Sequence, residues 1–193
     1  IHDDWMDNDD VRRGGPTVHA ALGAAFGSRS LGATSAVLAG DHASGLAQAA
    51  LLGVPLAPPR VCEAAREFAR IQEDVALGQM LDVHMSAGDP AAVERMHDLK
   101  TGSYTVRGPL AMGARLAGAS EGQLRVLERF AAPLGIAFQL RDDLLGTFGD
   151  PTATGKPAGS DLRQGKRTAL LVEADGQGDV EVYLARAMAA PPE

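Results

Sequence analysis

The sequence opens with Ile1-His2-Asp3-Asp4-Trp5-Met6-Asp7-Asn8-Asp9-Asp10, a stretch that holds five aspartates in ten residues. In a helix, Asp3 and Asp7 lie one turn apart on one face, whereas Asp4 points about 100° away from Asp3. Two carboxylates on one face repel each other unless a cation lies between them, and their hard oxygen atoms suit Mg2+. The alternative is an acidic helix start that only complements the helix dipole.

A second acidic pair decides between these interpretations, and it lies in Gln139-Leu140-Arg141-Asp142-Asp143. Gln139 and Asp142 are three residues apart and share a helical face. Charged residues on an otherwise apolar helix are costly unless they are paired or bound to metal. A long loop rich in glycine and proline follows, and loops of that length in compact domains are usually functional. This loop supplies three cations, which are Lys156, Lys166 and Arg167.

Together the two acidic clusters and their cations describe one kind of site. Mg2+ ions bridge the carboxylates to a polyanion such as diphosphate, which the carboxylates alone would repel. Apolar helices beside the site suit a hydrocarbon tail.

The composition limits which fold classes and which kinds of binding partner are plausible. With 193 residues the chain is long enough for one domain with a sizeable core, and 45% hydrophobic but only 4% aromatic residues favour helices packed on helices. The sequence therefore predicts an all-α fold. A net charge of -7 argues against a nucleic-acid partner. The single cysteine, Cys62, fits a reducing compartment, and no apolar run is long enough to span a bilayer, so a cytoplasmic protein is expected.

Apolar periodicity predicts a series of helices. Ser120 and Gln123 fit a capping box at the start of one of them. At Lys100 and Thr101 the helical pattern is interrupted, and a cation and hydroxyls near a helix break can bind an oxyanion, although an ordinary hinge is the alternative. The expected helices span residues 18–26, 34–52, 60 to about 85, 110–117 and 123–145.

The chain resembles the trans-isoprenyl diphosphate synthases of the polyprenyl synthetase family, over residues 1 to about 174. Each motif is weak alone, but their combination and order are specific. The matching stretches are Asp3-Asp4-Trp5-Met6-Asp7 with Arg12-Arg13-Gly14, Gly78-Gln79-Met80-Leu81-Asp82, Lys100-Thr101, Phe138-Gln139-Leu140-Arg141-Asp142-Asp143, Gly155-Lys156-Pro157 and Gly165-Lys166-Arg167-Thr168.

The resemblance implies a helical bundle around a deep central cavity, with the two acidic motifs facing each other at its mouth. It implies three Mg2+ ions, two held by Asp3 and Asp7 and one by Asp142. An allylic diphosphate ionises there, and isopentenyl diphosphate attacks the carbocation to extend the chain.

The resemblance also assigns roles to further side chains. The grip on the allylic diphosphate comes from Arg12, Lys100 and Lys156. Arg13 extends towards isopentenyl diphosphate, and Lys166 closes over the site. The carbocation is stabilised by the oxygen dipoles of Thr101 and Gln139.

Three departures from the family pattern affect these expectations. The last aspartate of the second motif is replaced by Gly146. The family's Gly-Gly-Lys-Arg stretch for isopentenyl diphosphate would precede Ile1, so residues 1–193 are expected to be a single polyprenyl synthetase domain that lacks N-terminal helices and part of its C-terminus. In the family that the chain resembles, product length depends on residues just before the first motif, where only Ile1 and His2 are present. That motif has no two-residue insertion, which resembles the geranylgeranyl and longer-chain branch of the family more than the bacterial farnesyl branch, so geranylgeranyl or a related polyprenyl diphosphate is the expected product.

Two alternatives remain open. A class I terpene cyclase shares the fold and the first motif, but Asp142 and Asp143 stand where a cyclase carries an Asn/Ser/Glu metal motif. A catalytically silent, diphosphate-binding partner subunit is favoured by Gly146 and disfavoured by the intact first motif. Family members commonly form homodimers, for which the small residues of the segment 36–47 are suited.

Overall fold

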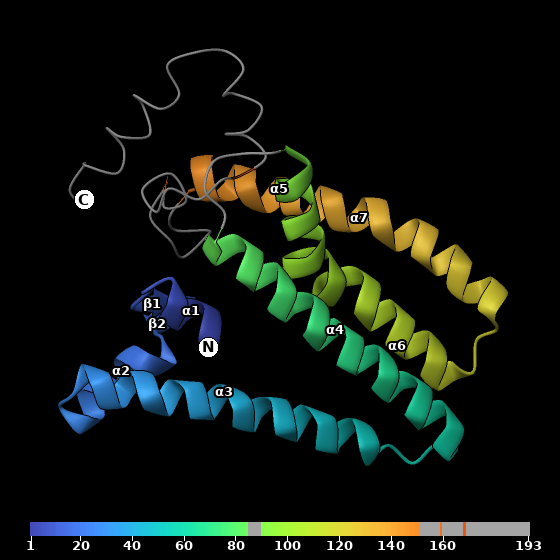
Figure 1. Cartoon of the computed structure of the whole chain (residues 1–193), viewed down its shortest axis with the longest axis horizontal. Coiled ribbons are helices and arrows are strands. Elements are labelled where there is room, and N and C mark those ends of the chain that lie inside the picture. Colours follow the sequence, from blue (N-terminus) through green and yellow to red (C-terminus); the bar gives the residue numbers. More distant parts are fainter. Residues whose placement is uncertain (85–89, 151–158, 160–167, 169–193) are drawn as a thin grey trace. The chain divides into compact units, whose positions relative to one another are not determined.

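The computed structural model describes residues 1–84, 90–150, 159 and 168 (Figure 1). The predicted all-α class is confirmed, because helices account for most of the described chain and the two strands are only two residues long each. The elements in order are α1 (His2–Met6), β1 (Val11–Arg12), β2 (Gly15–Pro16), α2 (Val18–Phe26), α3 (Arg29–Leu52), α4 (Pro58–His84), α5 (Pro90–His97), η1 (Asp98–Arg107), α6 (Gly108–Ala117) and α7 (Glu121–Phe148). None of the described helices is long and apolar enough to cross a membrane. The deep central cavity stays a prediction.

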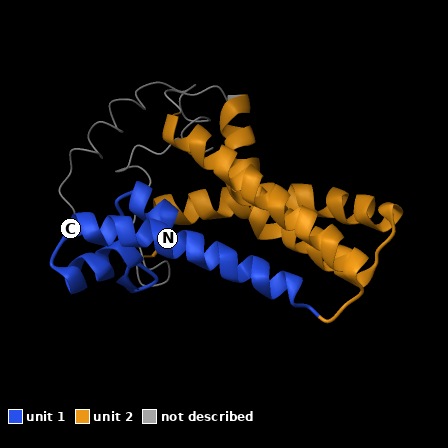
Figure 2. Ribbon diagram, turned by 60° about the horizontal axis from the view of Figure 1, so that its bottom comes forward, with its two compact units in different colours: residues 1–54, 151–157 blue, residues 55–150, 158–193 orange. Residues whose placement is uncertain are grey.

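The described residues fall into two compact units, 1–54 and 55–150 with Gly159 and Thr168 (Figure 2). The expected loop with Lys156, Lys166 and Arg167 lies outside the described residues.

Unit 1 is built on the packing of α2 against α3. Helix α2 ends at Gly27, whose φ of 64° is left-handed, and the N–H of Leu31 then donates to the Ser28 side chain at 3.3 Å. That cap starts α3 at Arg29, five residues before the predicted start. The two helices touch at Gly32, where a Cβ atom would lie 2.5 Å from the Gly23 nitrogen.

Substituting Gly32→Ala is expected to destabilise unit 1, because the new methyl group meets backbone atoms of α2, which cannot rotate away. Overpacking of this kind costs about 1–3 kcal/mol, against the gain of about 1 kcal/mol that alanine brings to a helix. Gly45→Ala on the same helix is the matched control, since nothing lies within 4 Å of its Cβ position. Thermal unfolding of both variants tests the contact, and equal melting temperatures would contradict it.

Unit 2 is organised around η1, which packs against both α4 and α7. On one side the backbone of Lys100 lies against Gly78 of α4, and on the other side a Cβ at Gly135 of α7 would lie 3.3 Å from the Gly102 Cα. Ser103 is almost fully buried, and its hydroxyl donates to the Leu99 carbonyl at 2.7 Å. Small residues at both crossings therefore let the η1 backbone approach its neighbours closely.

The predicted helix break at Lys100 is wrong. The chain continues through Asp98–Arg107 as a π-helix and runs directly into α6. At its end the N–H of Gly108 donates to the Ser103 carbonyl, five residues back. Pro109 follows at the start of α6 and has no N–H to offer. The wider π turn keeps the backbone hydrogen-bonded on the way to that proline.

The remaining predicted helices are found with modest shifts at their ends. Helix α2 has the predicted bounds, whereas α4, α6 and α7 begin about two residues earlier than predicted. The capping box of α7 is confirmed, because the Gln123 N–H donates to the Ser120 hydroxyl at 3.4 Å and the Ser120 N–H donates to Gln123 Oε1 at 2.9 Å.

Candidate functional site

The first acidic motif forms one short helix, α1, as the spacing predicts. The N–H of Asp7 donates to the Asp3 carbonyl at 2.8 Å, which places the two residues one turn apart. Asp4 points elsewhere, is 5% exposed, and lies 2.5 Å from the Arg12 guanidinium. Asp3 and Asp7 thus share one face of α1 and are half-buried, whereas Asp4 points in another direction and is buried.

Arg12 and Arg13 lie in a β-hairpin that follows this motif in the sequence. Strands β1 and β2 pair Val11 with Pro16 and Arg12 with Gly15, which leaves Arg13 and Gly14 as a two-residue turn. Both turn residues have positive φ, 52° and 75°, as a type I′ turn requires. The turn returns the chain so that Arg12 Nη1 lies 2.5 Å from Asp4 Oδ1 and 4.0 Å from Asp3 Oδ2. The sequence did not predict this hairpin.

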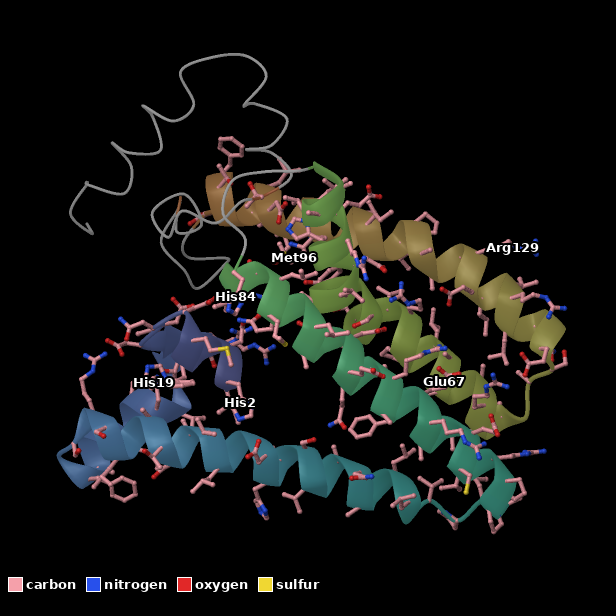
Figure 3. All side chains as sticks on the ribbon, viewed as in Figure 1. His2, His19, Glu67, His84, Met96 and Arg129 are labelled. Carbon is pink, nitrogen blue, oxygen red and sulfur yellow. The ribbon has the colours of Figure 1, made fainter. Side chains whose placement is uncertain are left out.

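Helix α1 is fixed to α3 by the residue before its first aspartate. His2 Nε2 lies 2.8 Å from the Val37 carbonyl oxygen, and Figure 3 shows the His2 side chain directed at α3. Its ring fills the space beside Gly40, where a Cβ atom would lie 2.2 Å from His2 Nε2. The position of Asp3 therefore depends on the space that Gly40 leaves in α3, a helix that lies further along the chain.

In unit 2, Lys100 of η1 binds Asp82 of α4. Lys100 Nζ lies 2.5 Å from Asp82 Oδ2, and both side chains are about one-fifth exposed, at 20% and 19%. Asp82 belongs to one of the stretches that carry the family resemblance, but the sequence did not predict its pairing with Lys100. The ammonium group is held in place by this contact and by the close backbone crossing at Gly78.

The second acidic motif divides between an exposed and a buried aspartate. Asp142 is exposed, whereas Asp143 is 3% exposed. Gln139 Nε2 donates to Asp143 Oδ1 at 2.7 Å, and among the described residues Gln139 Oε1 is buried without a hydrogen-bond partner. Gln139 was grouped with Asp142 by spacing, but its amide contacts Asp143 instead.

His97 is a member of this polar group that sequence reasoning missed. Burial lowers the pKa of His97, although the nearby carboxylates of Asp143 and Asp82 act to raise it, while Lys100 lowers it further. The imidazole is therefore neutral at pH 7. Its position three residues before Lys100, at the end of α5, was the available signal.

The structure brings the predicted residues together in two sets. Asp3, Asp7 and Arg12 adjoin one another in unit 1, and Arg13 lies exposed beside them in the hairpin turn. In unit 2, Lys100 and Thr101 lie on η1, while Gln139 and Asp142 lie on α7, which packs against η1. The remaining predicted residues, Lys156 and Lys166, lie outside the described part of the chain.

The carboxylates of Asp3 and Asp7 suit an Mg2+ ion that is also bound by a phosphorylated substrate. Within the described ranges no group of three or more His, Cys, Asp or Glu residues is arranged to hold a metal ion. Mg2+ typically binds through one or two carboxylates and completes its shell with water and substrate phosphates. The half-buried pair Asp3 and Asp7 offers such a partial shell.

Comparison with known proteins shows one family. The polyprenyl synthetase family model matches residues 1–187. The geranylgeranyl diphosphate synthase of Mycobacterium tuberculosis is 36% identical over 198 residues, which cover 99% of this chain and 53% of that protein. The short chain isoprenyl diphosphate synthase of Methanocaldococcus jannaschii is 34% identical over 176 residues, with 90% and 50% covered. The chain thus spans about half the length of the curated relatives it matches.

A solved structure agrees with this result. The geranylgeranyl pyrophosphate synthase of Corynebacterium glutamicum, complexed with isoprenyl diphosphate and magnesium, superposes with a TM-score of 0.89 at 35% identity and covers 100% of this chain and 58% of its own. With a family match over nearly the whole sequence, this chain belongs to the polyprenyl synthetase family.

Proposed function

We propose that the protein is a trans-prenyltransferase that condenses isopentenyl diphosphate with an allylic diphosphate. The observation that carries this proposal is the placement of Lys100 and Gln139 on two packed helices of one unit, each hydrogen-bonded to a carboxylate. A fixed ammonium group suits a diphosphate, and a fixed amide oxygen suits a carbocation. The family match and the names of the relatives support the same chemistry.

In this proposal, the residues of the chain bind and orient while the substrates supply the reacting groups. Asp3 and Asp7 would hold two Mg2+ ions and Asp142 a third, and these ions would supply positive charge that stabilises the departing pyrophosphate. Arg12 and Lys100, together with Lys156, grip the allylic diphosphate. No nucleophile from the protein is needed, because the double bond of isopentenyl diphosphate attacks the carbocation.

Further side chains are assigned to the second substrate and to the cation. Arg13, which lies exposed on the hairpin, reaches for isopentenyl diphosphate, and Lys166 closes the site. The hydroxyl of Thr101 and the amide oxygen of Gln139 direct their dipoles at the allylic cation, and the released proton passes to pyrophosphate. Geranylgeranyl diphosphate is the proposed product, in keeping with the names of several relatives.

Incorporation of labelled isopentenyl diphosphate by the full-length protein tests this proposal. Label is expected in a longer allylic diphosphate only when an allylic primer and Mg2+ are both present. If farnesyl diphosphate binds in an Mg2+-dependent manner but no label is incorporated, the protein is a silent partner subunit, and the synthase proposal is rejected.

We also infer that the two units form one polyprenyl synthetase domain, which one family model matches, and that this domain acts in the cytoplasm as a homodimer. Helix α3 is suited to a helical interface, because small residues run through its middle while Leu38 and Leu46 are exposed at 64% and 57%. Light scattering at working concentration tests the dimer. A monomer mass would contradict it.

A further inference from the structure

We propose that Asp143 is a positioning residue that fixes the side-chain amide of Gln139, so that the amide oxygen faces the reacting carbon. The inference rests on the proposed prenyltransferase function, in which Gln139 stabilises the allylic cation. It gives the second aspartate of the motif a role that differs from the metal binding proposed for Asp142.

The hydrogen bond between the two residues sets the direction of the amide. A carboxylate only accepts hydrogen bonds, so the group facing Asp143 must be the NH2 end of Gln139. Gln139 Nε2 lies 2.7 Å from Asp143 Oδ1, and the two residues are four apart on α7. Rotating the amide by half a turn would place its oxygen against a carboxylate oxygen, which is repulsive.

Burial makes this preference strong. Asp143 is 3% exposed, so little water is available to screen an unfavourable contact. Bonds to charged groups are also stronger than bonds between neutral groups. A glutamine on the exposed side of α7 would rotate freely between two orientations, whereas Gln139 has one.

The opposite end of the same amide is the functional end. Gln139 Oε1 is buried and has no hydrogen-bond partner within the described part of the chain. A buried oxygen without a donor is costly, and such atoms are uncommon in folded proteins. An electron-deficient carbon offers no N–H or O–H donor, but the negative end of a fixed amide dipole stabilises its positive charge without reorganisation.

The neighbouring aspartate cannot serve the same purpose. Consecutive residues of a helix point about 100° apart, and here Asp142 is exposed while Asp143 is buried. One carboxylate is thus available to a metal ion at the surface, and the other is directed at Gln139. The adjacent pair therefore combines two tasks that a single aspartate cannot perform.

A double-mutant cycle on the full-length protein tests this dependence. Asp143→Asn keeps the shape of the side chain, but its amide offers either a donor or an acceptor and no longer dictates the orientation of Gln139. We expect the single-turnover rate to fall by about tenfold to a hundredfold, with the KM for the allylic diphosphate nearly unchanged. In a Gln139→Met background, Asp143→Asn should lower the rate by less than about threefold, because the dipole is already absent.

Glu128→Gln is the matched control, since it removes the same charge from the same helix at a contact with Arg107, outside the site. It should leave the single-turnover rate unchanged. If Asp143→Asn lowers the rate as much in the Gln139→Met background as in the parent, the two residues act independently and the inference is overturned.

A spectroscopic measurement decides the contact without relying on turnover. In protein labelled with 15N-glutamine, the side-chain amide signals of Gln139 are those that Gln139→Met removes. In the parent they should be shifted downfield and exchange slowly with water, and Asp143→Asn should reverse both effects. Unchanged signals would overturn the inference. Failure of the parent to elongate any primer would instead reject the proposed function, while these signals would still report the hydrogen bond.

Discussion

Substituting Asp3→Asn is expected to lower turnover by at least about a thousandfold while the melting temperature changes little. The side chain of Asp3 is 42% exposed, and its carboxylate shares one face of α1 with Asp7, so removing one charge relieves a repulsion and leaves no cavity. Metal ions contribute several kcal/mol to transition-state stabilisation, and each 1.36 kcal/mol corresponds to about tenfold in rate. The rate of elongation and the thermal unfolding curve are the measurements.

Asp4→Asn is the control from the same helix. Asp4 is 5% exposed and pairs with Arg12 at 2.5 Å, so its loss should lower the melting temperature. The two adjacent aspartates are thus expected to affect different properties of the protein. A large fall in stability for Asp3→Asn, or turnover close to that of the parent, would contradict the proposed role of Asp3.

Gly78→Ala is expected to lower turnover by about a hundredfold, because it displaces the backbone that carries Lys100. A Cβ at Gly78 would lie 2.3 Å from the Lys100 nitrogen and 2.7 Å from its Cα, and neither atom can move without shifting η1. A displacement of about 1 Å in a group that positions the substrate is enough for a loss of about this size. Steady-state kinetics with the allylic diphosphate measure it.

The matched control for this variant is Gly113→Ala in α6. Its Cβ position has nothing within 4 Å, so the same substitution should stabilise the helix slightly and leave turnover unchanged. Equal activity of the two variants would show that Lys100 does not depend on the crossing between α4 and η1.

Much of the helical architecture followed from local sequence signals. The apolar periodicity and the Ser120–Gln123 capping box located α7, and the bounds of α2 were predicted without error. These elements are specified by residues within a few positions of their ends, which is why one sequence sufficed. The start of α3 was missed because the Ser28 cap lies only one residue after Gly27, between the two helices that the sequence predicted.

The departures arise where distant residues determine the local structure. The π-helix around Lys100 forms its backbone hydrogen bonds while it packs against α4 and α7. Nothing near Lys100 in the sequence distinguishes a π-helix from a helix break. The His2 ring likewise packs against Gly40, and these two residues are 38 positions apart in the sequence. Local propensity describes neither contact, because both depend on tertiary packing.

The composition of the site was predictable, but its internal pairing was not. Spacing placed Gln139 with Asp142, whereas burial of the next residue directs the glutamine amide to Asp143. The pairing of Lys100 with Asp82 and the neutral His97 beside them also depend on packing between α4, α5 and η1. Residue types thus indicated the chemistry, and the fold determined which carboxylate contacts which partner.

Mass analysis of the reaction product tests the central claim most directly. The full-length protein is incubated with isopentenyl diphosphate, one allylic diphosphate at a time and Mg2+, and the products are read by mass spectrometry. The account predicts a discrete prenyl diphosphate longer than its primer by whole isopentenyl units, and none when Mg2+ is removed. Recovery of every primer unchanged, or its conversion to a cyclic hydrocarbon without uptake of isopentenyl diphosphate, would contradict it.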